Sequence, residues 1–410
     1  MQIANKLSIL TTPCYFQAPH LNTFVSHLFE QGYTKSTMRR KQWLVNKLSQ
    51  WFSQQSLKVE ELNAQKMDQF IKLQGVKVTA RRGDRMTLRL LLQHLENLGI
   101  IPSSSLERTE DSILDRIEQD FVKYLAQERG LSQVTLIRYP AMVRRFLTGH
   151  FGQNAIQMEI LKATDITRFM LGYVPTVKRS TARLMATCLR AFFRYLYVDG
   201  IISINLAEFV PTVADWRMTD IPKFLEPEEV KLLLDHCDQR SKAGQRDYAI
   251  LLLLARLGLR AGEVTKMKLD DINWESGELL IRGKEPHTDR FPIPYDVGNA
   301  LATYLQQGRP SCSTRRVFVR TKAPYQGFSS SVAVCDLVQR ALLRADLHPT
   351  HKGAHLLRHS LAKKMLCQGA SLVEIGEVLR HRLVQTTEIY AKVDMMALQS
   401  LAQPWPGGEV

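Results

Sequence analysis

Cysteine is scarce in this sequence and follows no pattern. Six cysteines stand among 410 residues, at positions 14, 188, 237, 312, 335 and 367, and no two of them form a CxxC pair. A disulfide framework or a cysteine-ligated zinc site requires closely spaced, patterned cysteines. We therefore expect reduced thiols, which are typical of a cytoplasmic protein.

Long apolar runs are missing as well. The longest, AILLLLA at 249–255, is far shorter than the ~20 residues that a helix needs to cross a bilayer. The N-terminal stretch MQIANKLSILTTPCYF has no charged segment followed by a sustained apolar run, so we do not expect a secretory signal. The sequence predicts no membrane association.

Acidic residues are in deficit. The 40 Asp and Glu face 55 Lys and Arg, which gives a net charge of +15 and a pI of about 9.6. This excess indicates a polyanionic partner, most commonly nucleic acid. A basic protein of the membrane surface is the alternative, but neither an amphipathic cationic helix nor a lipidation signal is present. The length predicts two or three domains, and 45% apolar residues exclude extensive disorder.

The first half of the chain resembles itself at a spacing of about a hundred residues. The stretch that begins with FVSHLFEQG at Phe24 is similar to the one that begins with FVKYLAQERG at Phe121, and LRLLLQHLENLGII (88–101) is similar to LRAFFRYLYVDGII (189–202). Leucines and phenylalanines recur at helical spacing in both copies, and each copy has a glycine, Gly99 or Gly200, where a helix should end. We interpret this as a tandem duplication of a helical unit.

Basic residues cluster on the polar faces of both copies. A single cluster is usually a solvated helix face, but recurrence in both copies favours contacts with a nucleic-acid backbone. The predicted DNA-binding residues are Arg39, Arg40, Lys41, Arg81, Arg82 and Arg85 in the first copy and Arg138, Arg144, Arg145, Lys178, Arg179 and Arg183 in the second.

Two stretches rich in turn formers, PSSSLERTED (102–111) and PTVADWRMTDIPKF (211–224), predict linkers. Pro227, followed by Glu228 and Glu229, predicts the helix start that opens a third domain. We therefore predict helical domains at 1–105 and 112–212, a third domain at 222–396 and a C-terminal tail at 397–410.

The third domain contains six separated polar residues. RDYAILLLLARLGLRAGEVTKMKLDDI predicts a buried helix that ends near Gly258, a turn and a second helix, while GELLIRG and RFPIP predict a β-hairpin with Lys284 at its rim. In the helical AHLLRHSLAKKML, His355 and Arg358 share one face. Singly, none of these residues is specific. Their order is Arg260, Lys284, His355, Arg358, His381 and Tyr390.

That order and spacing closely resemble the tyrosine recombinase (phage integrase) family. LGLRAGEV is similar to the family's first arginine motif, HLLRHSLAKKMLCQGASLVEIGEVLRH to the second, and TTEIYAKV to the nucleophile segment. The resemblance covers the third domain and, more loosely, residues 112–212, which are similar to the family's core-binding domain. It implies a mainly α fold with a small β component, in which two helical SAM-like domains precede an α+β catalytic domain.

The resemblance also implies a role for each residue. Arg260 and Arg358 would bind the non-bridging oxygens of a DNA phosphate, and Tyr390 would attack the phosphorus. His355 would assist ionisation of the phenol, whose ordinary pKa is near 10, Lys284 would protonate the departing 5′ oxygen, and His381 would donate a hydrogen bond to the phosphate. Glu263 would orient the site.

The family pattern further implies a duplex DNA partner with specific recombination sites, a homo-tetramer on DNA that could include other recombinases, and a Holliday junction. It requires neither metal nor nucleotide. Such an enzyme works in the cytoplasm, on the nucleoid. Within the tail, Met395, Leu398 and Leu401 form a short apolar stripe that could dock on a neighbouring subunit or on the chain's own core.

Two departures from the family and three rival hypotheses stay open. The first helical domain is an extra copy that a minimal member of the family lacks, so the length of the DNA footprint cannot simply be transferred. The family has glycine where Arg380 precedes His381, so Arg380 could alter a helix turn or add a phosphate contact. His351, His355 and His359, at helical spacing, could serve a metallonuclease. A type IB topoisomerase shares much of the chemistry, although the doubled helical region favours site-specific exchange. A non-catalytic DNA-binding protein would be expected to lose one of the six residues.

Overall fold

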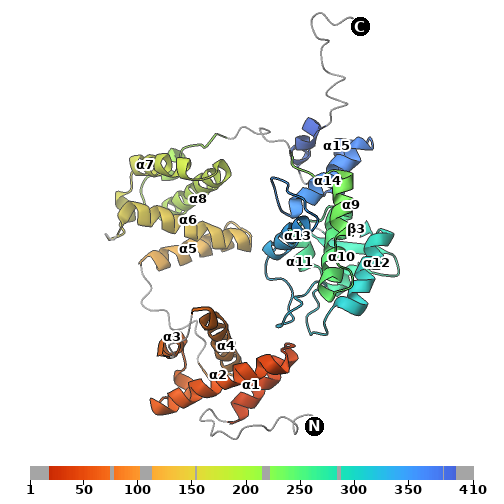
Figure 1. Ribbon diagram of the computed structural model, residues 1–410. Helices are drawn as coiled ribbons and strands as arrows, with labels where there is room; N and C mark the ends of the chain where they lie inside the picture. The colour runs from red at the N-terminus through yellow and green to blue at the C-terminus, as the bar shows by residue number, and fades with distance from the viewer. Residues whose placement is uncertain are drawn as a thin grey trace, which may run out of the picture. The chain divides into compact units, whose positions relative to one another are not determined.

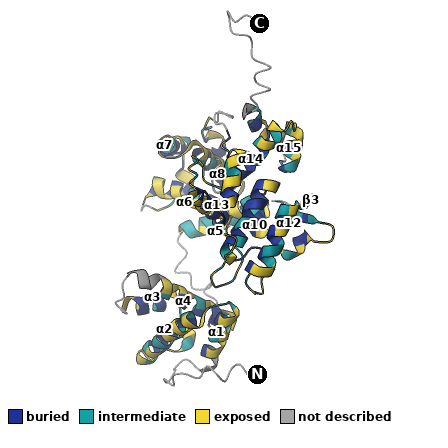
Figure 2. Ribbon diagram, turned by 45° about the vertical axis from the view of Figure 1, so that its right-hand side comes forward, coloured by how far each residue is buried: buried dark blue, intermediate teal, exposed yellow. Residues whose placement is uncertain are grey.

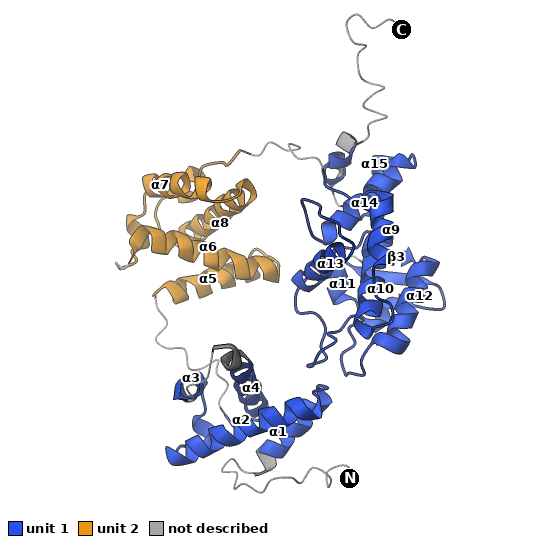
Figure 3. Cartoon of the chain, in the orientation of Figure 1, with its two compact units in different colours: residues 1–102, 220–410 blue, residues 103–219 orange. Residues whose placement is uncertain are grey.

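The computed structural model describes residues 18–73, 78–101, 113–152, 155–214, 222–283, 288–381 and 383–393. The chain divides into two compact units, residues 1–102 with 220–410 and residues 103–219 (Figure 3). Separate apolar cores form within residues 21–101, 121–210 and 225–357. The predicted boundaries near 105 and 112 lie outside the described residues, so the division into three domains remains a prediction.

In the described part of the N-terminal segment four helices follow one another along the chain: α1 (Ala18–Glu30), α2 (Lys35–Gln54), α3 (Ala64–Leu73) and α4 (Val78–Asn97) (Figure 1). The Thr34 hydroxyl accepts a hydrogen bond from the Thr37 amide and caps α2. Along α4, Leu88, Leu91 and Leu95 are buried, as their helical spacing predicts. Gly99 follows α4 in the left-handed conformation expected of it, with φ +69°.

The second unit repeats this order of helices, with α5 (Ile113–Gln127), α6 (Gln133–Phe151), α7 (Ala163–Tyr173) and α8 (Arg179–Val198). The helix α6 begins 98 residues after α2, and α7 begins 99 residues after α3. Leu189, Phe192 and Leu196 on α8 are fully buried, and Gly200 has φ +73°. The two segments thus share helix order and spacing, which supports the interpretation of a duplication.

The C-terminal segment packs around one buried helix. The apolar residues from Ile250 to Leu254 of α10 are buried, and Figure 2 shows this helix largely in the colour of buried residues. Pro227 occupies the first turn of α9, as predicted. The helices of this segment are α9 (Pro227–Asp235), α10 (Lys242–Leu257), α11 (Ala261–Lys266), α12 (Tyr295–Thr303), α13 (Val332–Arg344), α14 (Ala354–Cys367) and α15 (Leu372–Val378).

Three antiparallel strands form the sheet in the order β1 (Ile272–Asn273), β2 (Glu278–Arg282) and β3 (Thr288–Pro292). Leu279 and Ile281 alternate inward from β2, and Leu279 pairs with Phe291 on β3. The mainly helical fold with a small β component is therefore confirmed. Short turns of 3-10 helix lie at Val59–Glu61, Met158–Ile160, Val174–Thr176, Leu206–Phe209, Leu269–Asp271, Val384–Thr386 and Glu388–Val393, and a π-helical turn lies at Tyr304–Gly308.

None of the helices within the described ranges is both long enough and apolar enough to cross a membrane.

Candidate active site

Arg260 is placed by the end of one helix and the start of the next. Gly258 ends α10 in the left-handed conformation with φ +56°, which a residue with a side chain seldom adopts. The chain then turns, and Arg260 becomes the N-cap of α11. Its Nη1 donates to Glu263 Oε1 at 2.9 Å, and its backbone N–H donates to Glu263 Oε2 at 2.8 Å. Glu263 thus accepts two hydrogen bonds from Arg260, and its role in orienting the site remains a prediction.

Arg358 comes from α14 and is buried. Its Nη1 donates to the carbonyl of Gly258, and its Nη2 donates to the carbonyl of Leu379. Burial lowers its pKa to about 10, and the nearby Arg260 and Arg380 guanidiniums act in the same direction. Arg358 thus ties the turn after α10 to the turn after α15.

The two predicted clamp arginines meet at one short segment. Arg260 Nη2 donates to the carbonyl of Arg380 at 3.2 Å, while Arg358 bonds to the carbonyl of Leu379, the preceding residue. Residues 260 and 358 are distant along the chain, yet their guanidiniums donate hydrogen bonds to the carbonyls of two consecutive residues. This segment continues directly into His381 and Tyr390.

His381 is held by the loop that follows it. Its Nδ1 lies 2.8 Å from the hydroxyl of Thr387, and its ring stacks on that of Tyr390 with 6.4 Å between centroids. Burial lowers its pKa to about 4, and Arg358 and Arg260 add to the effect, so the ring is neutral at pH 7. In the tautomer that accepts the Thr387 proton at Nδ1, Nε2 carries a hydrogen and can donate to an anion.

Tyr390 lies in this cluster but is 1% exposed. Its hydroxyl lies 2.8 Å from Nδ1 of His359, and its ring packs with Ala362, Ile375 and Leu379. Burial raises the pKa of Tyr390 to about 12, while Arg358 acts in the opposite direction. The phenol is thus in its neutral form and has a histidine partner that the sequence analysis did not assign to it.

His355 occupies the turn of α14 before Arg358 and is exposed. Partial desolvation and the guanidiniums of Arg358 and Arg260 lower its pKa, which keeps the imidazole able to accept a proton at neutral pH. Its ring centroid is 6.3 Å from that of His359. His355 therefore stands beside the Tyr390 partner without being that partner.

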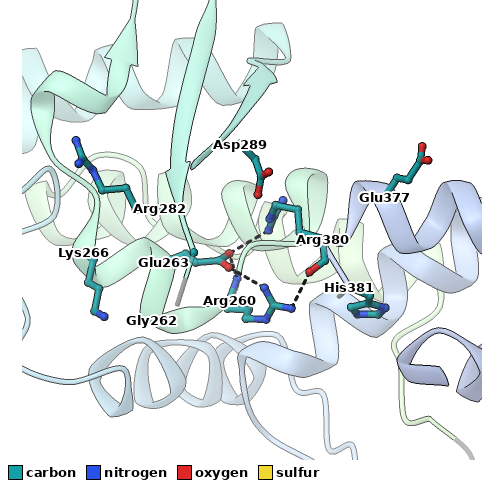
Figure 4. Close-up of a pocket in the computed structure, with 10 residues that line it drawn as sticks. Arg260, Gly262, Glu263, Lys266, Arg282, Asp289, Glu377, Arg380 and His381 are labelled. Carbon is teal, nitrogen blue, oxygen red and sulfur yellow. Dashed lines mark hydrogen bonds and ion pairs between the residues drawn. The ribbon is translucent and has the colours of Figure 1, made fainter. Parts of the chain in front are cut away.

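A pocket of about 690 Å³ opens beside these residues, and Figure 4 shows Glu263 between Arg260 and Arg380 on its wall. Five cationic or basic side chains outnumber three carboxylates in its lining. Those residues are Arg260, Gly262, Glu263, Lys266, Arg282, Gly283, Asp289, Glu377, Arg380 and His381.

Several residues of this site were not predicted from the sequence to belong to it. Arg282 lies at the end of β2 and donates to Asp271 at 2.6 Å, and Lys266 ends α11. His359 directly follows Arg358 in the sequence, and this position next to a predicted catalytic residue was the signal that could have identified it. Arg380 was noted only as a departure from glycine. Lys284 lies outside the described residues, so its place in the site remains a prediction.

The structure separates the predicted DNA-binding residues into groups. Arg39, Arg138, Arg145, Lys178 and Arg179 are exposed. Arg183 is exposed as well. Arg40 and Arg85 are exposed but lie near carboxylates, at 3.8 Å from Asp84 and 3.2 Å from Asp68 respectively. The side chains of Arg81 and Arg82 lie outside the described residues.

Two predicted DNA contacts have other partners. Lys41 does not lie on the exposed face that the sequence predicted: it is buried, its Nζ donates to Thr87 Oγ1 at 3.0 Å, and it lies over the ring of Tyr33. The exposed-face prediction for Lys41 is therefore wrong, because α4 covers this position of α2. Arg144 donates to both Glu118 and Asp115 at 2.6 Å, so a phosphate would compete with two carboxylates.

The histidine series proposed for a metallonuclease does not share a helix. Gly353 is the N-cap of α14, so His351 precedes the helix that carries His355 and His359. Across the described part of the chain, no three His, Cys, Asp or Glu side chains gather into a metal-binding group.

Comparisons with known proteins show which family the chain belongs to. The family model described as "Phage integrase family" matches residues 223–396, and "Phage integrase, N-terminal SAM-like domain" matches residues 119–200. The y4rA protein of Sinorhizobium fredii (strain NBRC 101917 / NGR234), named as a candidate integrase/recombinase, is 38% identical over 390 residues, 95% of either chain. The chain belongs to the phage integrase family.

Other members extend the likeness. Tyrosine recombinase XerD of Listeria monocytogenes (serotype 4b, strain F2365) is 30% identical over 69% of this chain and 96% of its own. The crystal structure of XerH site-specific recombinase bound to palindromic difH substrate shares the fold over 94% of both chains, with a TM-score of 0.54 at 17% identity. As a family member, the chain is a tyrosine recombinase, an enzyme that cleaves and rejoins DNA at specific sites.

Proposed function

We propose that this recombinase cleaves DNA by attack of the Tyr390 phenol on a backbone phosphorus. The new bond joins Tyr390 Oη to the phosphorus, the bond to the 5′ oxygen breaks, and a 3′-phosphotyrosyl linkage remains. The observation that carries the proposal is that Arg260 and Arg358 bond consecutive carbonyls of the segment that leads to Tyr390. This arrangement can bring two guanidiniums and one phenol to a single phosphate.

Charge explains the need for both arginines. A phosphodiester carries one negative charge, and attack adds charge to its non-bridging oxygens. Two guanidiniums can stabilise that charge by charge-assisted hydrogen bonds. Cleavage and rejoining each exchange one phosphoester for another, so the reaction consumes no nucleotide, and the arginines supply the charge for which other nucleases use a metal.

The other predicted residues transfer protons or donate hydrogen bonds during the reaction. The phenol proton passes to a base, for which His355 is the candidate because its lowered pKa keeps it neutral. Lys284 protonates the departing 5′ oxygen, and His381 donates a hydrogen bond from Nε2 to the phosphate. Because Tyr390 is 1% exposed, it must leave its site beside His359 before it attacks. DNA binding supplies that change.

Exchange between two duplexes follows from the same chemistry. We propose that four protomers, with other recombinases as possible partners, hold two specific recombination sites and pass through a Holliday junction. The excess of basic residues, +15 overall, supports a DNA partner. Exposed arginines and lysines in both helical segments would contact its backbone, and the enzyme would work in the cytoplasm, on the nucleoid.

The test is covalent capture. The purified chain is incubated with fragmented DNA from its own genome in excess EDTA, denatured, and the protein-linked DNA is sequenced. We expect adducts at few sites from the wild type and none from Tyr390→Phe, with binding retained. Tyr295→Phe, which removes an exposed hydroxyl on α12, is the matched control and should form adducts normally.

Three outcomes would contradict the proposal. Adducts that persist in Tyr390→Phe would move the nucleophile elsewhere, and cleavage that requires a divalent cation would favour the metallonuclease. Relaxation of supercoiled plasmids that lack any captured site would instead indicate a type IB topoisomerase.

A further inference from the structure

Arg380 has an unusual backbone for its residue type. Its φ is +55°, in the left-handed region where a side chain is disfavoured and glycine is not. The side chain is nevertheless 8% exposed, so the protein keeps a long cation in its interior at a position where glycine would be less strained. A buried guanidinium needs partners to offset its lost hydration.

Those partners are internal to the site. Arg380 Nη2 donates to Glu263 Oε2 at 3.0 Å, Nη1 donates to the carbonyl of Val378 at 3.2 Å, and the guanidinium lies 4.9 Å from the ring centroid of Phe291. Glu263 is also 8% exposed, so this ion pair is shielded from water and salt. Nε of Arg380 has no acceptor among the described residues.

The carboxylate of Glu263 is shared between two arginines. Its Oε1 accepts from Arg260 Nη1 at 2.9 Å, while its Oε2 accepts from Arg380 and from the Arg260 backbone N–H. The carbonyl of Arg380 accepts from Arg260 Nη2 at 3.2 Å. Side chain and main chain of Arg380 therefore both restrain the same guanidinium (Figure 4).

We propose that Arg380 is a positioning residue for DNA cleavage, which fixes Glu263 and, through that carboxylate and its own carbonyl, the guanidinium of Arg260. The inference rests on the proposed function. Without Arg380, the carboxylate of Glu263 would pair with Arg260 alone, and the charge of this pair would sum to zero. With Arg380 on the same carboxylate, the three side chains carry a net charge of one positive unit, which is available to a phosphate.

The ionisation of Glu263 agrees with this role. Burial acts to raise its pKa, but the Arg380 guanidinium and the hydrogen bonds from Arg260 outweigh burial and hold the pKa below its ordinary value. The carboxylate is therefore charged throughout the neutral range and able to hold both arginines.

The experiment compares Arg380→Met, Arg380→Lys, Glu263→Gln and the double variant Arg380→Met/Glu263→Gln on a nicked duplex of the sequence that the wild type captures. Single-turnover adduct formation and DNA affinity are measured separately. We expect Arg380→Met to slow cleavage on the order of 10²-fold, as small misplacements of a catalytic group do, with affinity and its salt dependence unchanged. Arg380→Lys should recover part of the rate.

The energetic coupling between the two substitutions shows whether Arg380 acts through Glu263. If Arg380 acts through Glu263, the double variant is no slower than the slower single variant, because both substitutions break one network. The matched control is Arg256→Met, which breaks an Arg–Asp pair with Asp296 at 2.8 Å away from the site and should leave the rate unchanged.

Several results would overturn the inference: cleavage by Arg380→Met at the wild-type rate, additive losses in the double variant, or a weaker affinity with a shallower salt dependence, which would mean direct contact with a phosphate. A wild type that forms no adduct refutes the proposed function instead. In that case crystal structures of the DNA-free wild type and Arg380→Met decide, since an unmoved Arg260 guanidinium in the variant contradicts positioning.

Discussion

The hydroxyl of Tyr390 lies 2.8 Å from Nδ1 of His359, within a cluster that leaves the tyrosine 1% exposed. The histidine that the family resemblance pairs with it, His355, lies one turn earlier on α14 and is exposed. Before DNA binds, the proposed nucleophile thus rests against a histidine outside the predicted set, and the proposed base faces solvent.

This hydrogen bond should be measurable as a coupling. A buried hydroxyl that loses its partner is destabilising, and a hydrogen bond contributes about 1 kcal/mol net. In a cycle of His359→Ala, Tyr390→Phe and the double variant, we expect a coupling of about 1 kcal/mol in the free energy of unfolding by urea. The exposed His236→Ala, combined with Tyr390→Phe, should give purely additive effects. A coupling near zero for His359 would deny the bond any energetic role.

Stability should fall on mild acidification. Burial lowers the pKa of His359 and of His381 to about 4, against an ordinary value of about 6.5. Below about pH 6.5 these two histidines bind protons in the unfolded chain but stay neutral in the folded chain. The free energy of unfolding is therefore highest above about pH 6.5 and declines towards pH 4. Urea unfolding at pH 7.5 and pH 5.0 measures the decline.

The matched variant for this pH dependence is His359→Gln/His381→Gln, which should show a smaller loss between the same two pH values. The interval lies above the titration of Glu263, whose pKa is lowered, so that carboxylate does not contribute. An unchanged loss in the double variant would assign the effect to other groups.

The two clamp arginines should differ in stability but not in catalysis. Arg358→Met leaves the buried carbonyls of Gly258 and Leu379 without their donor, at a cost of about 2–4 kcal/mol. Arg260 is 40% exposed, so Arg260→Met should cost about 1 kcal/mol or less. Both should slow adduct formation by at least ~10²-fold. Urea unfolding and adduct rates test this, and a reversed order of stabilities would contradict it.

Exposed and paired arginines of the second helical unit should differ in DNA binding. Arg179 is exposed at the start of α8, and its replacement by alanine should weaken binding to any sequence and reduce the salt dependence by about one phosphate contact. Arg144→Ala should leave the salt dependence unchanged, because Glu118 and Asp115 already hold that guanidinium. Fluorescence anisotropy across salt concentrations makes the comparison, and equal slopes for the two variants would refute it.

Local patterns were predictable because their causes lie close together in the sequence. Gly258 and Gly200 mark helix ends since glycine alone adopts positive φ freely, and both have it. The spacing of Leu189, Phe192 and Leu196 defines the buried face of α8 without reference to other segments. The helix start at Pro227 follows from proline's fixed φ.

The sequence by itself therefore determined the helices, the hairpin strands, the basic excess and the order of the six residues. Only the tertiary structure decided that Lys41 is buried and donates to Thr87 on another helix, that His359 partners Tyr390, and that Arg380 bonds to Glu263. Each depends on atoms that meet across 31 to 117 positions of chain. Burial and ion pairing are fixed by such distant contacts, whereas periodicity and φ preference are properties of neighbouring residues.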